Sequence, residues 1–368
     1  MIDSTSSVSA RFVHLGPLSL AMSRFAPFRI TAALLLPLLS GCAAEAAPPS
    51  PAEVPADTAR AVAANQLLAR TINLSNSLEA PTEGEWGYTI TPEHLDAIQA
   101  AGFTAVRVPV KWTAHAQQTA PYTVDPAFFA RIDEVLNQAL ERRLAVVLDL
   151  HHYDEIHDDP SNANFDRLVG IWRQIARRYQ NRPAALVFEP LNEPSLQLTT
   201  KRWSEKFPEV LAAIRETNPT RAVLVGPGNW NQIQELKDLT LPPDPDLILT
   251  VHTYEPYEFT HQGATWSENP PPTGRVFPRP GEEAEIRAFL DDCEAYAKPR
   301  NRPVFVGEFG VIRHAHEASR ARWARFMRTE YERRGWSWGY WGFAAEFPAY
   351  DKVQGRWIEP MRAALLDD

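Results

Sequence analysis

Short apolar runs recur along the chain from about residue 60 to its end, and helical patterns separate most of them. The runs are continuously apolar rather than alternating, which is typical of parallel strands buried on both faces. Eight such strands are expected, at Arg70–Leu74, Thr104–Val108, Leu144–Leu150, Ala185–Phe188, Ala222–Val225, Leu247–Val251, Pro303–Val306 and Ser337–Phe343. Eight strand and helix units within about 300 residues favour a single domain with an α/β fold, the closed (β/α)8 or TIM barrel.

The segments between these runs carry apolar residues at helical spacing. Helices are expected at Pro92–Ala101, Pro126–Arg142, Asn164–Tyr179, Trp203–Thr217, Glu282–Ala297 and Ala318–Arg334, with Glu359–Leu365 after the last strand. The link after the fifth strand has the weakest pattern, with Asn231–Leu239 as a short helix. No Gly-x-Gly-x-x-Gly follows the first strand and no Walker-type loop occurs, which argues against an open nucleotide-binding sheet.

The composition argues against one large class of partner. The formal net charge is −9 and the pI is near 5.6, whereas a nucleic-acid-binding protein is expected to carry a basic stripe. Aromatic residues make up 10% of the chain, and 11 residues are tryptophan. Tryptophans in loops suit stacking on the flat apolar faces of sugars, so the composition is compatible with a carbohydrate ligand and not with nucleic acid.

The N-terminal segment has the pattern of an export signal. Ile30–Leu39 is largely apolar but too short to span a bilayer, and the run ends in Leu39-Ser40-Gly41-Cys42. This ending resembles the bacterial lipobox, in which the cysteine is lipidated, so Cys42 is expected to carry a lipid anchor. Ala43 rather than Asp after the cysteine favours retention in the outer membrane. The alternative is a plain secretory signal and a secreted protein.

These observations divide the chain into three parts. Residues 1–42 form the signal peptide with its lipobox, and a start at Met22 would give a signal of conventional length. Residues 43–59 are rich in Ala, Pro and Glu without apolar periodicity, and they are expected to form a tether. Residues 60–368 form the barrel domain.

Two glutamates occupy the same local setting near predicted strand ends. Glu193 follows the apolar run Ala185–Phe188, and Glu308 follows the run Pro303–Val306. The C-terminal ends of the strands carry the chemistry of a (β/α)8 barrel. Hydrolysis of a glycosidic bond needs two carboxyl groups, one that protonates the leaving oxygen and one that is ionised. The sequence therefore predicts a glycoside hydrolase.

Polar or aromatic side chains also lie at or just beyond the ends of nearly all the remaining predicted strands. They are Asn73, Asn76, Arg107, His151, His152, Asn192, Asn229, Trp230, His252, Tyr254 and Trp341. The pair His151 and His152 raises the question of a metal site, but adjacent residues on a strand point to opposite faces. No zinc-binding spacing accompanies the pair. No metal and no cofactor are therefore expected, and His151 is expected to contact substrate while His152 lines the cleft.

Six of these segments together resemble the motif series of glycoside hydrolase family 5, in its order and at about its spacing. They are Val106-Arg107-Val108-Pro109, Leu148-Asp149-Leu150-His151-His152, Leu191-Asn192-Glu193-Pro194, His252-Thr253-Tyr254, Gly307-Glu308-Phe309-Gly310 and Tyr340-Trp341-Gly342-Phe343. The resemblance runs from about Arg60 to the C-terminus. Ile72–Pro81 and Phe259–Trp266 are similar to a subgroup of bacterial endo-β-1,4-glucanases with some mannan activity. Ser75 departs from that subgroup, which carries Gly there.

The resemblance implies a role for each matching residue. Glu193 would be the acid/base and Glu308 the nucleophile of a retaining double displacement, consistent with carboxylates about 5–5.5 Å apart. Arg107 would keep Glu308 ionised while Glu193 keeps a raised pKa. The other supporting or substrate-binding residues would be Asn192, His151, His152, His252, Tyr254, Trp341, Asn76, Glu79 and Trp266.

The expected function is endo-acting hydrolysis of internal β-1,4-glucosidic bonds in cellulose-like or mixed-linkage glucans by an exported, membrane-anchored monomer. One alternative is a β-mannanase, xyloglucanase or other β-glycanase of the same fold, because the motifs do not fix sugar identity. A second alternative, from a different class, is an inactive glycan-binding lipoprotein. The presence of both glutamates argues against the second alternative.

Overall fold

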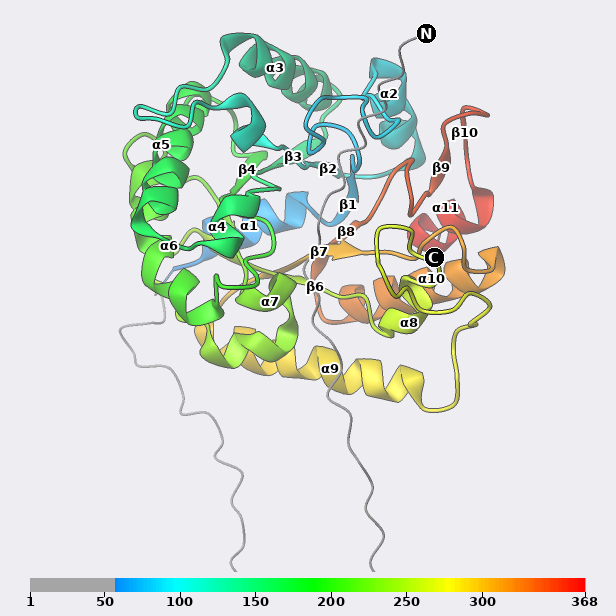
Figure 1. Cartoon of the computed structure of the whole chain (residues 1–368). Coiled ribbons are helices and arrows are strands. Elements are labelled where there is room, and N and C mark those ends of the chain that lie inside the picture. The colour runs from blue at the N-terminus through cyan, green and yellow to red at the C-terminus, as the bar shows by residue number, and fades with distance from the viewer. Residues whose placement is uncertain (1–56, 368) are drawn as a thin grey trace, which may run out of the picture. The chain divides into compact units, whose positions relative to one another are not determined.

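The computed structural model describes residues 57–367, and eight parallel strands in that part form a closed barrel (Figure 1). The strands are β1 (Arg70–Asn73), β2 (Ala105–Val108), β3 (Ala145–Asp149), β4 (Leu186–Glu189), β5 (Val223–Val225), β6 (Leu247–His252), β7 (Val304–Phe309) and β8 (Ser337–Tyr340). Each strand pairs with the next one along the chain, and β1 pairs with β8 to close the ring. The predicted (β/α)8 barrel is confirmed.

Helices follow the strands and surround the barrel (Figure 1). The α-helices are α1 (Ala59–Leu67), α2 (Pro92–Ala101), α3 (Pro126–Glu141), α4 (Asp154–Asp158), α5 (Asn162–Tyr179), α6 (Thr200–Arg215), α7 (Gly228–Asn231), α8 (Tyr257–Thr260), α9 (Glu282–Ala297), α10 (Glu317–Arg333) and α11 (Glu359–Leu366). Short 3-10 helices are η2 (Trp112–His115), η3 (Ile233–Asp238) and η4 (Lys298–Arg300). A hairpin of β9 (Tyr350–Asp351) and β10 (Arg356–Trp357) lies between β8 and α11.

Local sequence sets where several helices begin and end. In α2, Thr91 caps the N-terminus in a capping box, Pro92 occupies the first turn, and the helix ends at Gly102 with φ 102°. In α3, the Asp125 side chain accepts a hydrogen bond from the backbone N–H of Ala127. These start and stop signals explain why the predicted bounds of both helices match the structure to within one residue.

The strands are buried on both faces, which explains their continuous apolar character. In β3, Ala145 and Val147 pack in a cluster that also contains Phe305, while Val146 and Leu148 belong to the larger apolar layer shared with the helices. Side chains along a strand alternate between its faces. The smaller cluster therefore fills the barrel interior, and the larger one lies between the sheet and the helix ring.

Helix α1 was not predicted, and it lies against the segments where β6, β7 and β8 begin. The side-chain amide of Asn65 donates to the Val304 carbonyl at 3.1 Å, and the Ser337 hydroxyl donates to the Asn65 carbonyl at 2.6 Å. Arg60 forms an ion pair with Asp246 at 2.9 Å. Because α1 contacts the N-terminal ends of three strands, it covers the end of the barrel opposite the expected catalytic mouth.

Three predicted elements differ from the structure near the mouth. Strand β7 continues to Phe309, so Glu308 lies within the strand rather than beyond it. The segment predicted as the helix Asn231–Leu239 forms only the 3-10 helix η3, after the tight turn α7 with left-handed backbone angles. Strand β8 ends at Tyr340, three residues before the predicted end.

The predicted signal peptide, its lipobox with Cys42, and most of the predicted tether lie outside the described residues. Within residues 57–367, no helix combines the length and the apolar character needed to cross a bilayer.

Candidate active site

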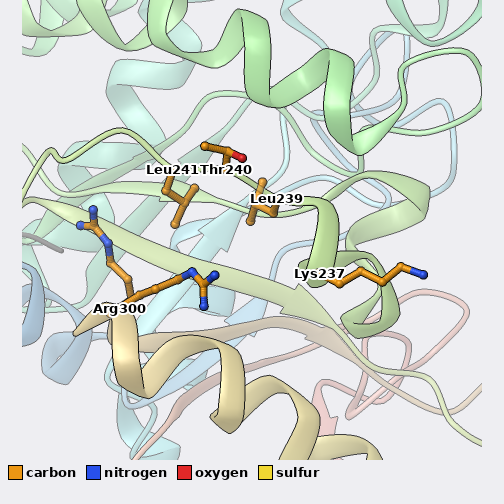
Figure 2. Close-up of a pocket in the computed structure, with 6 residues that line it drawn as sticks. Lys237, Leu239, Thr240, Leu241 and Arg300 are labelled. Carbon is orange, nitrogen blue, oxygen red and sulfur yellow. The ribbon is translucent and has the colours of Figure 1, made fainter. Parts of the chain in front are cut away.

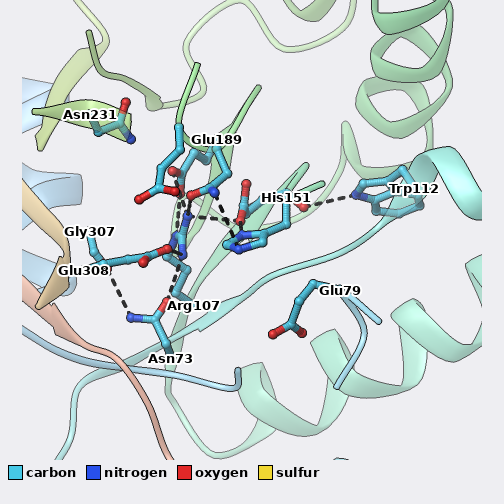
Figure 3. Close-up of polar contacts among 12 residues, drawn as sticks. Asn73, Glu79, Arg107, Trp112, His151, Glu189, Asn231, Gly307 and Glu308 are labelled. Atoms are coloured by element: carbon cyan, nitrogen blue, oxygen red, sulfur yellow. Dashed lines mark hydrogen bonds and ion pairs between the residues drawn. The ribbon is translucent and has the colours of Figure 1, made fainter. Parts of the chain in front are cut away.

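The guanidinium of Arg107, on β2, is fully buried among three carboxylates (Figure 3). Its Nε and Nη2 donate to the two oxygens of Glu189 at 2.7 and 2.9 Å. Nη2 also lies 3.0 Å from Asp149 Oδ2, and Nη1 donates to Glu308 Oε1 at 2.8 Å. Asp149 and Glu189 pair in register at the ends of β3 and β4. Side chains from β2, β3, β4 and β7 therefore meet at one cation.

Arg107 also fixes the orientation of two amide side chains. It donates through Nη1 to Asn73 Oδ1 at 2.9 Å and through Nη2 to Asn192 Oδ1 at 2.8 Å. With its oxygen engaged, Asn73 donates its amide to the Gly307 carbonyl at 3.1 Å. The amide nitrogen of Asn192 is left on the other side, 3.5 Å from His151 Nε2. This orientation leaves the Asn192 N–H groups, rather than its oxygen, available for a sugar hydroxyl.

His151 connects the buried acids to the aromatic wall of the site. Burial lowers the pKa of its imidazole well below the usual value, so the ring is neutral, and its Nδ1 donates to Asp149 Oδ2 at 2.6 Å. The ring stacks on Trp341, with centroids 5.3 Å apart and planes 7° apart. Trp341 is therefore held as a rigid, half-buried surface beside the carboxylates.

Glu193 follows β4 and is the more exposed of the two predicted catalytic carboxyl groups. Its side chain is 24% exposed, against 6% for Glu308. Its Oε1 lies 2.7 Å from Nδ1 of His252, whose own pKa falls to about 4 through burial. Burial raises the pKa of Glu193 to about 8, a rise that the more distant charge of Arg107 only partly opposes. The raised pKa favours the protonated form of Glu193 near neutral pH.

Glu308 is placed by an irregularity in the sheet. The pairing register of β7 shifts on both sides, against β6 near His252 and against β8 between Val306 and Phe309. A Cβ at Gly307 would lie 2.8 Å from Thr250 Oγ1 and 2.9 Å from His252 Nε2, so only glycine fits there. Such bulges redirect side chains, and this one turns Glu308 towards the mouth.

The surroundings of Glu308 favour its charged form more than those of Glu193 do. Burial raises the pKa of Glu308 to about 7, while His252 and Arg107 oppose the rise. The hydroxyl of Tyr254 donates to Glu308 Oε2 at 2.9 Å, and burial keeps the phenol protonated by raising its pKa. Burial raises the pKa of both groups, and the higher value, at Glu193, has the direction expected from the sequence.

The two catalytic candidates lie close enough to act on one bond. One oxygen of Glu193, one oxygen of Glu308 and Nδ1 of His252 all lie within 4.8 Å of one another. Ligands of one tetrahedral zinc ion lie about 3.3 Å apart, whereas His252 Nδ1 and Glu193 Oε1 are separated by 2.7 Å. That distance suits a hydrogen bond with a shared proton. The contact between His252 and Glu193 therefore favours acid–base chemistry over zinc binding.

The remaining predicted residues lie around this centre. Glu79 is buried in the loop after β1, where its carboxylate accepts hydrogen bonds from the backbone N–H groups of Asn76 and Ser77, apart from the Arg107 cluster (Figure 3). Trp266 is 45% exposed in the loop after β6 and lies 5.9 Å from Phe347 between ring centroids.

The expectation that His151 and His152 point to opposite faces is wrong. Their rings lie 4.6 Å apart with planes at 80°, and His152 also meets the exposed Trp86 edge-on at 5.9 Å. Both histidines follow the last residue of β3, Asp149, so the strand alternation no longer applies to them. Both rings therefore lie on the mouth side, as the predicted contact and cleft-lining roles require.

Asp149 and Glu189 were not among the predicted site residues. Each is a charged residue at the end of a buried apolar strand, and that pattern was the available signal.

A pocket outside the site, shown in Figure 2, is lined by Lys237, Leu239, Thr240, Leu241, Arg300 and Arg302. Arg302 donates to the carbonyls of Pro242 and Asp244, in the segment that leads into β6. This pocket therefore lies away from the mouth.

Comparison with known proteins places the chain in a family. Residues 69–346 match the family model "Cellulase (glycosyl hydrolase family 5)". Endoglucanase H of Acetivibrio thermocellus is 37% identical over 270 residues, which is 73% of this chain and 29% of that protein. This chain therefore corresponds to less than a third of that relative's length.

Solved structures give the same result. A structure of Thermotoga maritima Cel5A in complex with cellobiose is 40% identical, with a TM-score of 0.81, and the match covers 83% of this chain and 99% of that one. A structure of the same protein in complex with mannotriose is 40% identical, with a TM-score of 0.80 and the same coverage. The matched region contains the Arg107 cluster and both glutamates, and the chain belongs to glycosyl hydrolase family 5.

Proposed function

We propose that the protein hydrolyses internal β-1,4-glucosidic bonds of glucans and retains the anomeric configuration. The observation that carries the proposal is the pair Glu193 and Glu308, whose oxygens lie within 4.8 Å while their pKa values differ in the direction that acid and nucleophile require. The endoglucanase names of several relatives support the choice of a glucan and of internal cleavage.

In the first step, Glu308 attacks the anomeric carbon while Glu193 gives its proton to the leaving oxygen. The Tyr254 hydroxyl and the Arg107 guanidinium hold the attacking carboxylate in place. The Asn192 amide, turned outward by Arg107, is positioned to donate to the sugar 2-hydroxyl, a contact that strengthens as positive charge develops on the ring. The Trp341 ring supplies a flat apolar surface for the sugar that is attacked.

In the second step, Glu193 removes a proton from water, and the water displaces Glu308 from the sugar. The two carboxyl groups repel each other when both are charged. Esterification of Glu308 removes its charge and lowers the pKa of Glu193, which converts the acid of the first step into the base of the second. One chain supplies all the groups named in these two steps, which supports the proposal that the enzyme acts as a monomer.

A panel of purified polysaccharides tests the function. Barley β-glucan and carboxymethylcellulose are expected to lose viscosity rapidly while reducing ends rise slowly, because each cut falls inside the polymer. Glucomannan and mannan are expected to be cleaved more slowly. Release of single sugars from chain ends alone would contradict internal cleavage, and activity on no polymer would favour an inactive glycan-binding protein.

Mannan is the second candidate substrate, because one solved relative at 40% identity is in complex with mannotriose. A tenfold preference in kcat/KM corresponds to about 1.4 kcal/mol of transition-state binding. A preference of that size for unsubstituted mannan over β-glucan would make the protein a β-mannanase of the same fold.

Substitution of each glutamate separates the two roles. Glu308→Gln removes the nucleophile and is expected to lower kcat on every substrate by about 10³-fold or more. Glu193→Gln is expected to spare substrates with good leaving groups, and azide should restore turnover by replacing the water that Glu193 no longer activates. The azide product should have the retained β configuration by NMR. An inverted product from the wild-type enzyme would contradict the assignment.

The two pKa values predict the pH profile of kcat/KM. Activity should fall as the pH drops below about 7, where Glu308 becomes protonated, and as it rises above about 8, where Glu193 loses its proton. In Glu193→Gln, assayed on β-cellobiosyl fluoride, the alkaline limb should disappear. The acid limb should stay near pH 7, because Glu193 is already mostly uncharged where Glu308 titrates. An alkaline limb near pH 8 that persists in this variant would contradict the assignment.

We also propose that the protein is exported and attached to the outer membrane through a lipid on Cys42. Support comes from the apolar run Ile30–Leu39, the ending Leu39-Ser40-Gly41-Cys42 and the Pro-rich segment that follows. The full chain, expressed in a Gram-negative bacterium, should incorporate labelled palmitate and sediment with outer membranes. Cys42→Ser should abolish both properties and leave the enzyme in a soluble fraction. A wild-type protein without label would indicate a plain secretory signal.

A further inference from the structure

Basic residues gather at the end of the barrel opposite the mouth. The loops that lead from a helix into the next strand lie at that end, and we call the surface that they form with α1 the basal face. Within the described residues, these loops carry eight basic and three acidic residues, although the whole chain has a net charge of −9. The basic residues are Arg142, Arg143, Arg182, Arg221, Lys298, Arg300, Arg302 and Arg334, and the acidic ones are Glu216, Asp244 and Asp246.

All three acidic residues of the basal face are already paired with arginines of neighbouring helices. The ion pairs are Glu216–Arg173, Asp244–Arg215 and Asp246–Arg60, at 2.9, 2.7 and 2.9 Å. Among the basic residues, Arg142 and Arg334 pair with carboxylates, while the buried Arg221 and Arg302 donate to backbone carbonyls. Within residues 57–367, the other four form no ion pair and are exposed or half-buried, and we call them the basal cations: Arg143, Arg182, Lys298 and Arg300.

One basal cation stands where the local backbone favours another residue. Arg143 follows the C-cap of α3 with φ 61°, and its N–H donates to the Leu140 carbonyl at 2.9 Å. Glycine is the usual residue at such a helix end, because a Cβ is unfavourable at positive φ. Departures from local preference are expected at functional surfaces, and this one brings an unpaired charge to the basal face.

The basal face also exposes apolar side chains, and the proposed tether joins the barrel there. Val62 and Leu67 on α1 are 38% and 44% exposed. Val62 and Lys298 line the same hollow, so apolar and basic groups adjoin. The 14 residues between Cys42 and Asp57 span at most about 50 Å when fully extended. A lipid on Cys42 would therefore keep the basal face close to a bilayer.

We propose that the basal face docks on phosphate-bearing lipid headgroups of the membrane that holds the anchor, and that this contact points the mouth away from the bilayer. The headgroup phosphates complement the basal cations, and Val62 and Leu67 contact the apolar boundary below them. The lipid on Cys42 raises the local concentration of the basal face at the membrane, so a contact too weak to retain the unanchored protein during fractionation still orients the anchored one. The proposal rests on the anchoring proposed above and is independent of the reaction.

The full chain with Cys42→Ser separates this contact from the lipid. It should sediment with concentrated vesicles that contain about 30% phosphatidylglycerol but not with pure phosphatidylcholine vesicles, and about 0.5 M NaCl should release it by screening the charges. Each basic residue near an anionic surface strengthens binding about fivefold. Arg143→Gln, Lys298→Gln and Arg300→Gln combined should therefore weaken binding about 100-fold.

The matched control combines Lys201→Gln, Arg279→Gln and Arg356→Gln. These three residues are also exposed, but they lie in the first turn of α6 and in the segments after β6 and β8, towards the mouth. The control changes the net charge by the same amount and should bind the anionic vesicles within about twofold of the parent chain. An equal loss in both triple variants would show that net charge alone attracts the protein, and it would overturn the basal face.

A dye at each end of the barrel tests the orientation. Cys293 is buried, so a cysteine introduced into the Cys42→Ser chain can be labelled by itself. On anionic vesicles that carry a headgroup quencher, a dye at Asn181→Cys, in the loop before β4, should be quenched. A dye at Val353→Cys, in the turn between β9 and β10, should not be quenched.

Equal quenching at both ends, or equal binding to pure phosphatidylcholine vesicles, would overturn the proposal. Retention on a polysulfated polymer without binding to the anionic vesicles would assign the face to an acidic polysaccharide instead. A wild-type chain that takes up no palmitate would refute the anchor, and inactivity on every polysaccharide would refute the proposed reaction. Both of those failures are measured separately from vesicle binding, so each remains distinguishable from failure of the basal face.

Discussion

The site depends on a single buried cation, Arg107, that is shared by three carboxylates. Glu189 on β4 and Asp149 on β3 form ion pairs with the guanidinium, and Glu308 on β7 accepts a hydrogen bond from its Nη1. A buried ion loses several kcal/mol of hydration free energy, and loss of one partner of a buried pair typically costs about 3–5 kcal/mol. Arg107 therefore fixes Glu308, the proposed nucleophile, to the barrel wall, and it also sets the orientation of the Asn192 amide.

The barrel architecture follows from the sequence because burial on both faces leaves a strong signal in each strand. Both proposed catalytic glutamates and Arg107 could be located for a related reason, since strand ends in this fold converge on one mouth. Helix α1 escaped prediction because its Ala-rich sequence has little apolar periodicity. Asp149 and Glu189 were missed because their role arises from cross-strand register and from contact with a distant arginine, neither of which is visible in local sequence.

The loops account for the other differences between sequence and structure. His151 and His152 share one side because the chain has already left the regular strand geometry, where alternation holds. The turn at Trp230 adopts left-handed angles because contacts with Pro194 and Thr200, far away in sequence, outweigh the local preference of tryptophan. Local propensity therefore determines where the helices and strands form, whereas tertiary contacts determine the conformation of the loops at the mouth.

The same burial raises the pKa of both proposed catalytic glutamates, but it suits them to different roles because their partners differ. Glu308 lies against a permanent cation and a phenol donor, both of which stabilise the carboxylate. Glu193 contacts a neutral imidazole and lies further from the cation, so little offsets its loss of hydration. A bulge at Gly307 and a left-handed turn at Glu193 direct the two side chains towards one another. Backbone irregularity thus sets the distance between the two groups, and the asymmetric placement of one arginine decides which of them holds the proton.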